Sequence, residues 1–206
     1  MSDAAIPPAR IRPARADEIA AVGAQVSNSF DDLAADAYLI PVPADRERLM
    51  AAFFTLETEN AFRQGRVEVV DHPDGGYAAV AVWFDRTQPL AEPEGYMERL
   101  AAAVGEHIDR FGELGELFEK NHPADPHWHL AFLAVRRGEQ SRGLGGLLMK
   151  NVHDGLDAEG LPAYLEATNP DNVRLYRRYG YQDMDPFEMY LPDGTAFYRM
   201  WRPPAS

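Results

Sequence analysis

The stretch from Ala131 to Lys150 constrains the fold of this chain more than any other part of the sequence. A continuous apolar run, His129 to Val135, is short enough to be a buried strand. A polar, glycine-rich turn from Arg136 to Gly143 follows, after which leucines and valines return at helical spacing. A buried strand, a turn of exposed amides and a helix N-terminus together favour anion binding, because the first helical amides lack partners and the helix dipole attracts negative charge.

The residues of the turn strengthen this interpretation. Its glycines allow the backbone to approach a ligand closely, and its arginines add cationic donors: Gly143, Gly145, Gly146, Arg136, Arg137 and Arg142. We therefore predict a cradle for a diphosphate. It is not a P-loop, since no Gly-Lys-Ser/Thr follows, and it lacks the Gly-x-Gly-x-x-Gly of dinucleotide sites. The alternative is an ordinary glycine-rich turn between a strand and a helix.

Length and charge limit the classes of function. A chain of 206 residues suits one domain, and we expect residues 1–206 to form it, with a loose tail over residues 1–9. The net charge of −13 argues against nucleic acid as a partner. The same charge would attract a cationic ligand such as an amine, or it simply keeps the protein soluble.

Two absences in the sequence are also informative. No apolar run has membrane-spanning length and no signal peptide is evident, so we expect a cytoplasmic protein. The chain has no cysteine, which excludes disulfides, thiolate metal ligands and an acyl-cysteine intermediate. Any acyl transfer would therefore be direct or would use another nucleophile.

Periodicity and turn residues predict the order of elements along the chain. We expect strands at 10–12, 67–70, 77–84, 129–135, 162–167, 181–190 and 196–201, and helices at 16–26, 44–65, 94–120, 144–160 and 169–179. The 94–120 segment is one long helix or two broken ones. Residues 30–43 form a short helix with an extended exit, serving either as a lid over a site or as a surface connection. This order predicts a mixed sheet with helices on both faces, of α/β or α+β class.

Two motifs in the second half carry a family resemblance. The spacing Gln140-x-x-Gly143-x-Gly145 resembles the (Gln/Arg)-x-x-Gly-x-(Gly/Ala) signature of the GNAT superfamily of acetyl-coenzyme A-dependent N-acetyltransferases. The later strand and helix are similar to a second pattern of that superfamily, here Asn169, Asn172, Leu175, Tyr176, Gly180 and Tyr181. The first half matches only in its order of elements. The resemblance implies a mixed, mostly antiparallel central sheet of about seven strands, covered by helices on both faces.

Three phrases look like a closer relative, the puromycin N-acetyltransferase subgroup. They are AAVAVWF at 78–84, ADPHWHLAFLAV at 124–135 and LPAYLEATNPDNVRLYRRYGY at 161–181. That subgroup also carries a helical insertion before the central strand, which corresponds to residues 94–121 here. Its members transfer acetyl from acetyl-CoA to an amine of an aminonucleoside antibiotic. From this likeness we carry over the reaction class and not the antibiotic.

The resemblance also implies which residues hold acetyl-CoA, the acyl-donor cosubstrate. In the family the central strand splays from its neighbour and exposes backbone amides, and the matching residues are Leu133, Ala134 and Val135. We expect the Val135 N–H to polarise the thioester carbonyl. Asn172 would bind the coenzyme's arm, or it would cap its helix. The remaining coenzyme residues are Arg137, Gly138, Gln140, Ser141, Arg142, Gly143, Leu144, Gly145, Gly146, Asn169 and Tyr176.

The catalytic candidates are a tyrosine and two possible bases. Tyr176 matches a family position near the coenzyme sulfur, and a phenol is a suitable acid for a departing thiolate; the alternative is a packing aromatic. Glu166 is a charged residue within an otherwise apolar strand, and such residues usually have an ion-pair partner or a functional role. His129 lies on the central strand, where some histone-modifying members have a glutamate, and it titrates in a useful range. A water-relayed base, or none, is the third option.

The histidines near the central strand raise the question of a metal. His122, Asp125, His127 and His129 are close in sequence, and 127 and 129 would share a strand face. Prolines at 123 and 126 keep the loop irregular and no further ligands are evident, so we predict no metal site.

The first hypothesis for function is an N-acetyltransferase that moves acetyl from acetyl-CoA to a primary amine of a small molecule by direct attack. A second is a non-catalytic acyl-CoA-binding sensor or partner module. A third is acetylation of protein amines. For partners we expect acetyl-CoA and a small-molecule amine, no nucleic acid and no membrane, with the protein a monomer or a homodimer.

Overall fold

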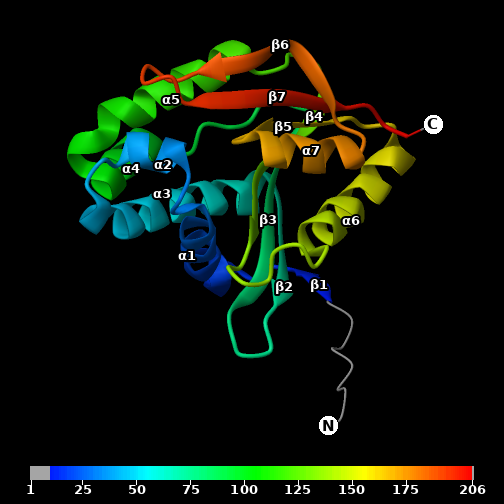
Figure 1. The fold of residues 1–206 in the computed structure, drawn as a ribbon, viewed down its shortest axis with the longest axis horizontal. Helices are drawn as coiled ribbons and strands as arrows, with labels where there is room; N and C mark the ends of the chain where they lie inside the picture. The colour runs from blue at the N-terminus through cyan, green and yellow to red at the C-terminus, as the bar shows by residue number, and fades with distance from the viewer. Residues whose placement is uncertain (1–9, 206) are drawn as a thin grey trace.

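The computed structural model describes residues 10–205, and it contains a seven-stranded mixed sheet (Figure 1). The strands lie in the order β1-β2-β3-β4-β5-β7-β6, and every neighbouring pair is antiparallel except β4 with β5. The predicted mixed, mostly antiparallel sheet with flanking helices is therefore confirmed. The strand bounds are β1 Ile11–Pro13, β2 Gly65–Asp71, β3 Tyr77–Arg86, β4 His127–Val135, β5 Ala163–Ala167, β6 Gln182–Tyr190 and β7 Ala196–Arg202.

Helices cover both faces of the sheet because the interior strand β3 is apolar on both sides. In β3, Val80 and Val82 pack into a core with α1, α3 and α4, whereas Ala79 and Ala81 pack into a second core with α6 and α7. Fully apolar strands of this kind are typical of a sheet buried on both faces. The helix bounds are α1 Ile19–Phe30, α2 Ala34–Leu39, α3 Pro43–Gln64, α4 Tyr96–Val104, α5 Ile108–Asn121, α6 Leu144–Glu159 and α7 Pro170–Arg178.

The structure corrects one helix prediction and decides between the two alternatives left open for another. The helix predicted for residues 16–26 is a 3₁₀ turn, Ala16–Glu18, followed by α1, which continues to Phe30. The segment 94–120 is two helices, because α4 ends at Gly105, whose φ of 59° places it in the left-handed region that glycine tolerates. The extra turn at the end of α1 is important for the site, since it brings Ser29 and Phe30 to the sheet.

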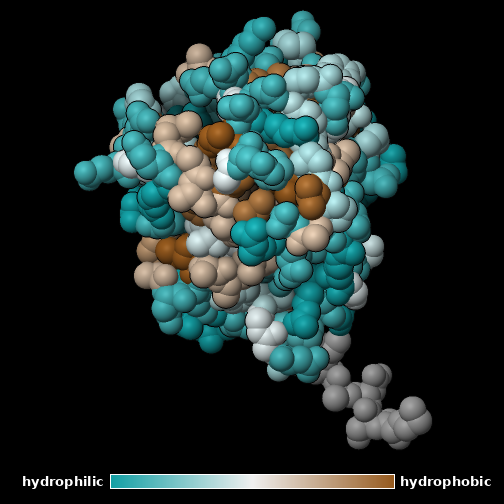
Figure 2. Space-filling view, turned by 90° about the vertical axis from the view of Figure 1, so that its left-hand side faces the viewer, coloured by the Kyte–Doolittle hydropathy of each residue, from teal (hydrophilic) through white to brown (hydrophobic). Residues whose placement is uncertain are grey.

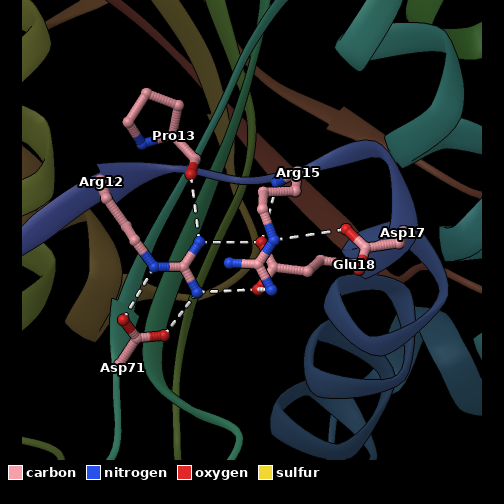
Figure 3. Close-up of polar contacts among 6 residues, drawn as sticks. All are labelled: Arg12, Pro13, Arg15, Asp17, Glu18 and Asp71. Atoms are coloured by element: carbon pink, nitrogen blue, oxygen red, sulfur yellow. Dashed lines mark hydrogen bonds and ion pairs between the residues drawn. The ribbon is translucent and has the colours of Figure 1, made fainter.

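An ion network joins the short edge strand β1 to its neighbours (Figure 3). The Arg12 guanidinium donates two hydrogen bonds to Asp71 of β2, at 2.6 and 2.8 Å, and two to Glu18, both at 2.8 Å. The bonds from Arg12 lower the pKa of Glu18 to about 2. A strand of three residues makes few ladder bonds, so this paired network contributes to holding it in place.

In residues 10–205 no helix combines the length and the hydrophobicity that crossing a bilayer requires. The face shown in Figure 2 is largely hydrophilic, with hydrophobic residues exposed near its centre. The predicted loose tail, residues 1–9, lies outside the described residues. All described strands belong to one sheet, and the single-domain organisation with a helical insertion at 94–121 stays a prediction.

Candidate active site

The two central strands β4 and β5 part from each other along their length. They pair in parallel only at Trp128 with Ala163 and at His129 with Tyr164. Beyond that point β4 stays paired with β3 as far as Val135, which lies opposite Ala79. Residues 130–135 of β4 therefore have a strand neighbour on one side only, and a gap opens on the other.

The direction of the backbone groups in this gap follows from the pairing. The Arg136 N–H donates to the Ala78 carbonyl at 2.9 Å, so the alternation of an antiparallel ladder turns the backbone of Ala134 toward β3. The same alternation turns the N–H and C=O groups of Leu133 and Val135 toward the gap. Ser29 at the end of α1 donates to the Val135 carbonyl at 3.2 Å, while the Val135 N–H faces the gap.

A cavity of about 540 Å³ occupies the gap. Its volume lies within the usual range of small-molecule sites. It is bordered by the end of α1, by β4, by the turn before α6, and by β5 and α7. The structure brings most of the predicted site residues to its wall: Leu133, Val135, Gln140, Ser141, Gly143, Leu144, Gly145, Gly146, Glu166, Asn169, Asn172 and Tyr176.

The predicted cradle forms one side of this wall. Helix α6 begins after Gly143, which has a φ of 81°, and the Leu147 N–H makes an early helical bond to the Gly143 carbonyl at 2.9 Å. The amides of the first turn before Leu147 have no intrahelical acceptor and face a ligand or solvent. At Gly146 an added Cβ would collide with the Tyr179 hydroxyl, so the glycine leaves room for the Tyr179 ring beside the helix start.

Four predicted coenzyme residues do not border the cavity. Arg137 bonds to the Asn28 carbonyl at 3.0 Å and to Asp32 at 2.9 Å, and Arg142 is paired with Glu139. The Gly138 N–H donates to the Gln140 side chain at 2.7 Å. Ala134 is buried in the core and bonds toward β3. Their proposed coenzyme contacts stay predictions, and the Gly138 N–H would have to release Gln140 before it could bind the coenzyme.

The start of α7 separates the roles of its two asparagines. Asn169 is the cap, since its side-chain oxygen accepts the Asn172 N–H at 2.9 Å. The alternative that Asn172 caps the helix is therefore wrong. The Asn172 amide group instead donates to the Thr168 hydroxyl at 3.2 Å at the cavity wall, where it can also meet a ligand.

Tyr176 lies at the cavity wall with 8% of its surface exposed. Its hydroxyl makes no hydrogen bond within residues 10–205, although its ring packs edge-on against Tyr181. Burial raises the pKa of Tyr176, so the phenol stays protonated at neutral pH. A protonated, unpaired hydroxyl at the wall of a cavity is a suitable proton donor to a ligand.

The two candidate bases form a pair. His129 Nε2 and Glu166 Oε2 are 2.8 Å apart across the paired ends of β4 and β5. Burial raises the pKa of Glu166, but the electrostatic attraction and hydrogen bond of His129, together with Tyr164 and Arg86, outweigh burial and hold the pKa below its usual value. Glu166 borders the cavity, whereas His129 does not and contacts the cavity wall through the carboxylate.

Behind this pair, a second pair of histidines has defined tautomers. His127 Nδ1 lies 2.7 Å from the Asp125 carbonyl, which can only accept, so this nitrogen carries the proton. His127 Nε2 must then accept from His122 Nε2, 3.1 Å away. Burial lowers the pKa of both rings, to about 4 for His127 and about 2 for His122, so both are neutral. Among residues 10–205 no three acidic or histidine side chains are arranged to hold a metal ion.

Sequence reasoning missed part of the cavity wall. Ser29, Phe30 and Leu33 come from the end of α1 and the turn to α2, and they border the cavity beside β4. The hypothesis that residues 30–43 form a lid was the available signal; of that segment Phe30 and Leu33 border the cavity, and the lid stays a prediction. The other wall residues that were not predicted as site residues are Leu130, Ala131, Glu139, Thr168, Asp171, Leu175, Arg178 and Tyr179.

Comparison with known proteins agrees with this geometry. The model of the acetyltransferase (GNAT) family matches residues 36–181, most of the chain. The chain belongs to the GNAT acetyltransferase family. Members of this family use acetyl-CoA, which is the cosubstrate that the motifs predicted.

Solved structures and a curated protein give the same picture of this GNAT chain. A structure described as histone acetyltransferase HPA2 and related acetyltransferase, from Corynebacterium glutamicum, is 25% identical with a TM-score of 0.71, covering 96% of this chain and 97% of the other. Arylalkylamine N-acetyltransferase 2 from Aedes aegypti is 12% identical with a TM-score of 0.62, covering 96% and 100%, and shows the fold alone. An uncharacterised N-acetyltransferase of Schizosaccharomyces pombe is 33% identical over 57 residues, 28% of this chain and 23% of that protein.

Proposed function

We propose that the protein transfers acetyl from acetyl-CoA to a primary amine of a small molecule by direct attack of the amine on the thioester. The observation that carries this proposal is the parting of β4 from β5, which turns the Val135 N–H toward a cavity that also contains the α6 cradle and the Tyr176 hydroxyl. The three groups suit the carbonyl, the diphosphate and the sulfur of one acyl-coenzyme molecule.

The coenzyme would run along the gap in place of a missing strand. Its diphosphate accepts from the first-turn amides of α6, near Gly143 to Gly146, where the helix dipole favours negative charge. Its pantetheine arm pairs with the gap-facing backbone of Leu133 and with the Asn172 amide. This arrangement leaves the thioester beside Tyr176.

The chemistry then needs a neutral amine and a stabilised leaving group. Glu166, ionised because of His129, takes one proton from the acceptor ammonium, and the free amine attacks the thioester carbon. The Val135 N–H stabilises the oxygen that gains charge. Tyr176 protonates the departing thiolate and regains a proton from the nitrogen of the intermediate, so one proton is released in net terms.

A small-molecule acceptor is supported by the shape of the site. Phe30 and Leu33 add apolar walls to a cavity of about 540 Å³, a size that suits a compact amine better than an extended peptide. The likeness to the puromycin N-acetyltransferase subgroup points to the same substrate class. We also propose a cytoplasmic protein that acts as a monomer or a homodimer, without a resident metal.

An acceptor screen tests this proposal. The protein is incubated with acetyl-CoA and a panel of amines and lysine peptides, and free thiol is measured. Thiol release with one class of small amines is expected. Coenzyme binding without thiol release from any amine would favour a non-catalytic acyl-CoA sensor, and release with peptides only would favour a protein acetyltransferase. Lysine peptides are included in the screen because the similar Corynebacterium glutamicum structure is described as a histone acetyltransferase.

A further inference from the structure

The carbonyl of Val135 is occupied by a side chain and not by a strand. Ser29 Oγ donates to this carbonyl at 3.2 Å, and Gln25 Nε2 donates to Ser29 Oγ at 3.0 Å. An amide nitrogen can only donate, and a carbonyl oxygen can only accept. The direction of the chain is therefore fixed: Gln25 donates to Ser29, and the Ser29 hydroxyl proton points at Val135.

This bond completes the support of one peptide unit. The unit between Val135 and Arg136 is bonded through its carbonyl to Ser29 and through its N–H to the Ala78 carbonyl at 2.9 Å. Held at both ends, this unit fixes the orientation of the last residue of β4. The end of the strand cannot tilt toward β5 without breaking one of these bonds.

The bond also determines which backbone group the gap presents. Val135 turns both its N–H and its C=O toward the gap, and in a closed sheet both would pair with β5. With the carbonyl taken by Ser29, the N–H is the group that remains for a ligand. A thioester carbonyl requires a donor at this point, and an unpaired acceptor beside it would repel the oxygen as it gains charge.

We propose that Ser29 is a positioning residue that holds the mouth of the gap open and leaves Val135 as a hydrogen-bond donor to the acyl group. This inference rests on the proposed function, because it concerns the same acyl site. Gln25 acts one step further out, by preventing the Ser29 hydroxyl from rotating away.

The helix that carries Ser29 offers a matched control. Ser27 is buried, and its hydroxyl donates to the Glu47 carbonyl at 3.3 Å, away from the cavity wall. Ser27→Ala therefore removes the same kind of bond from the same helix. Ser29→Thr keeps the hydroxyl, and Gln25→Ala keeps Ser29 but removes the donor that orients it.

The experiment measures acetyl-CoA binding by calorimetry, thiol release, and hydrogen exchange of the peptide that covers residues 133–136 in the free protein. For Ser29→Ala we expect a Kd for acetyl-CoA about 10-fold higher and faster exchange of that peptide. For Gln25→Ala we expect a Kd about 3-fold higher. Ser29→Thr and Ser27→Ala should stay within about 2-fold of the wild type in Kd.

The outcomes separate this inference from the proposed function. If the wild type binds acetyl-CoA and Ser29→Ala binds equally well with unchanged exchange, Ser29 has no positioning role. If Ser27→Ala weakens binding as much as Ser29→Ala, the effect is general loss of stability and the inference fails. If the wild type does not bind acetyl-CoA, the proposed function fails, while the exchange data still report on the support of Val135. Gln25→Ala carries the test if Ser29→Ala does not fold.

Discussion

The two halves of β4 differ in what they do with their backbone. Residues 127–129 pair with β3 on one side and meet β5 on the other, so their backbone is largely used within the sheet. Residues 130–135 pair with β3 alone and border a cavity. In the closed half, chemistry is left to side chains such as His129. In the open half, the backbone itself becomes the binding group.

This contrast explains how one strand can serve both stability and function. Backbone groups in protein interiors are nearly always paired, so an unpaired stretch of strand is costly unless something replaces the missing neighbour. Ser29 replaces it at the Val135 carbonyl. At the N–H groups of Leu133 and Val135, we propose that the coenzyme does so.

The largest expected effect is that of removing the hydroxyl at the open half. Tyr176→Phe should lower kcat by about 100-fold and leave the Kd for acetyl-CoA unchanged, because the phenol acts only when the thiolate leaves. Steady-state kinetics and calorimetry check this. Tyr181→Phe is the control, since its hydroxyl bonds to His153 at 3.1 Å in the core and its activity should change by less than about 2-fold. Wild-type turnover in Tyr176→Phe would remove this residue from the mechanism.

The next largest expected effect on kcat is at the boundary between the two halves of β4, where His129 is hydrogen-bonded to Glu166. Glu166→Gln should lower kcat roughly 30-fold at neutral pH, because it removes the proton acceptor. In the wild type the pKa of Glu166 lies below its usual value of 4.5, so the carboxylate is active at neutral pH and activity falls only as pH drops below that value. The pH–rate profile measures this loss of activity at acid pH.

His129→Asn sharpens the same test. Without His129, the largest contributions that oppose burial are lost, so the pKa of Glu166 rises. The acid limb of the pH–rate profile should then move upward, toward neutral pH, while the rate at high pH recovers toward that of the wild type. An acid limb that stays in place would show that Glu166 is not the group that titrates.

A smaller effect is expected at the cradle. Gly146→Ala places a Cβ against the Tyr179 hydroxyl, so the Tyr179 ring, which borders the cavity, must shift, and we expect about a 10-fold higher Kd for acetyl-CoA. Gly155→Ala, on the same helix with open space around it, should leave binding unchanged and raise the free energy of unfolding by up to about 1 kcal/mol. Calorimetry and thermal unfolding of both variants provide the comparison.

The sequence predicted the open half of β4 better than its surroundings. The apolar run and the glycine-rich turn are local patterns, so the strand, the α6 start and the Tyr176 helix could be read directly from residues close in sequence. The end of α1 could not be read in this way, because Ser27, Asn28 and Ser29 show no apolar period although the helix continues through them.

Contacts between residues that are far apart in the sequence could not be predicted from the sequence. His129 and Glu166 appeared as competing bases, and only the parallel contact of β4 with β5 brings them together. Arg137 and Arg142 appeared as phosphate donors, but Asp32 and Glu139 lie close enough in the fold to bind them. Charge alone does not reveal which cations are already paired.

Hydrogen exchange along β4, with and without acetyl-CoA, tests the central claim most directly. Amides of the open half, at Leu133 and Val135, should exchange readily in the free protein and become protected when the coenzyme binds. Amides of the closed half, at Trp128 and His129, should be protected in both states. Equal protection of both halves in the free protein, or no change at Leu133 and Val135 on adding coenzyme, would contradict the account.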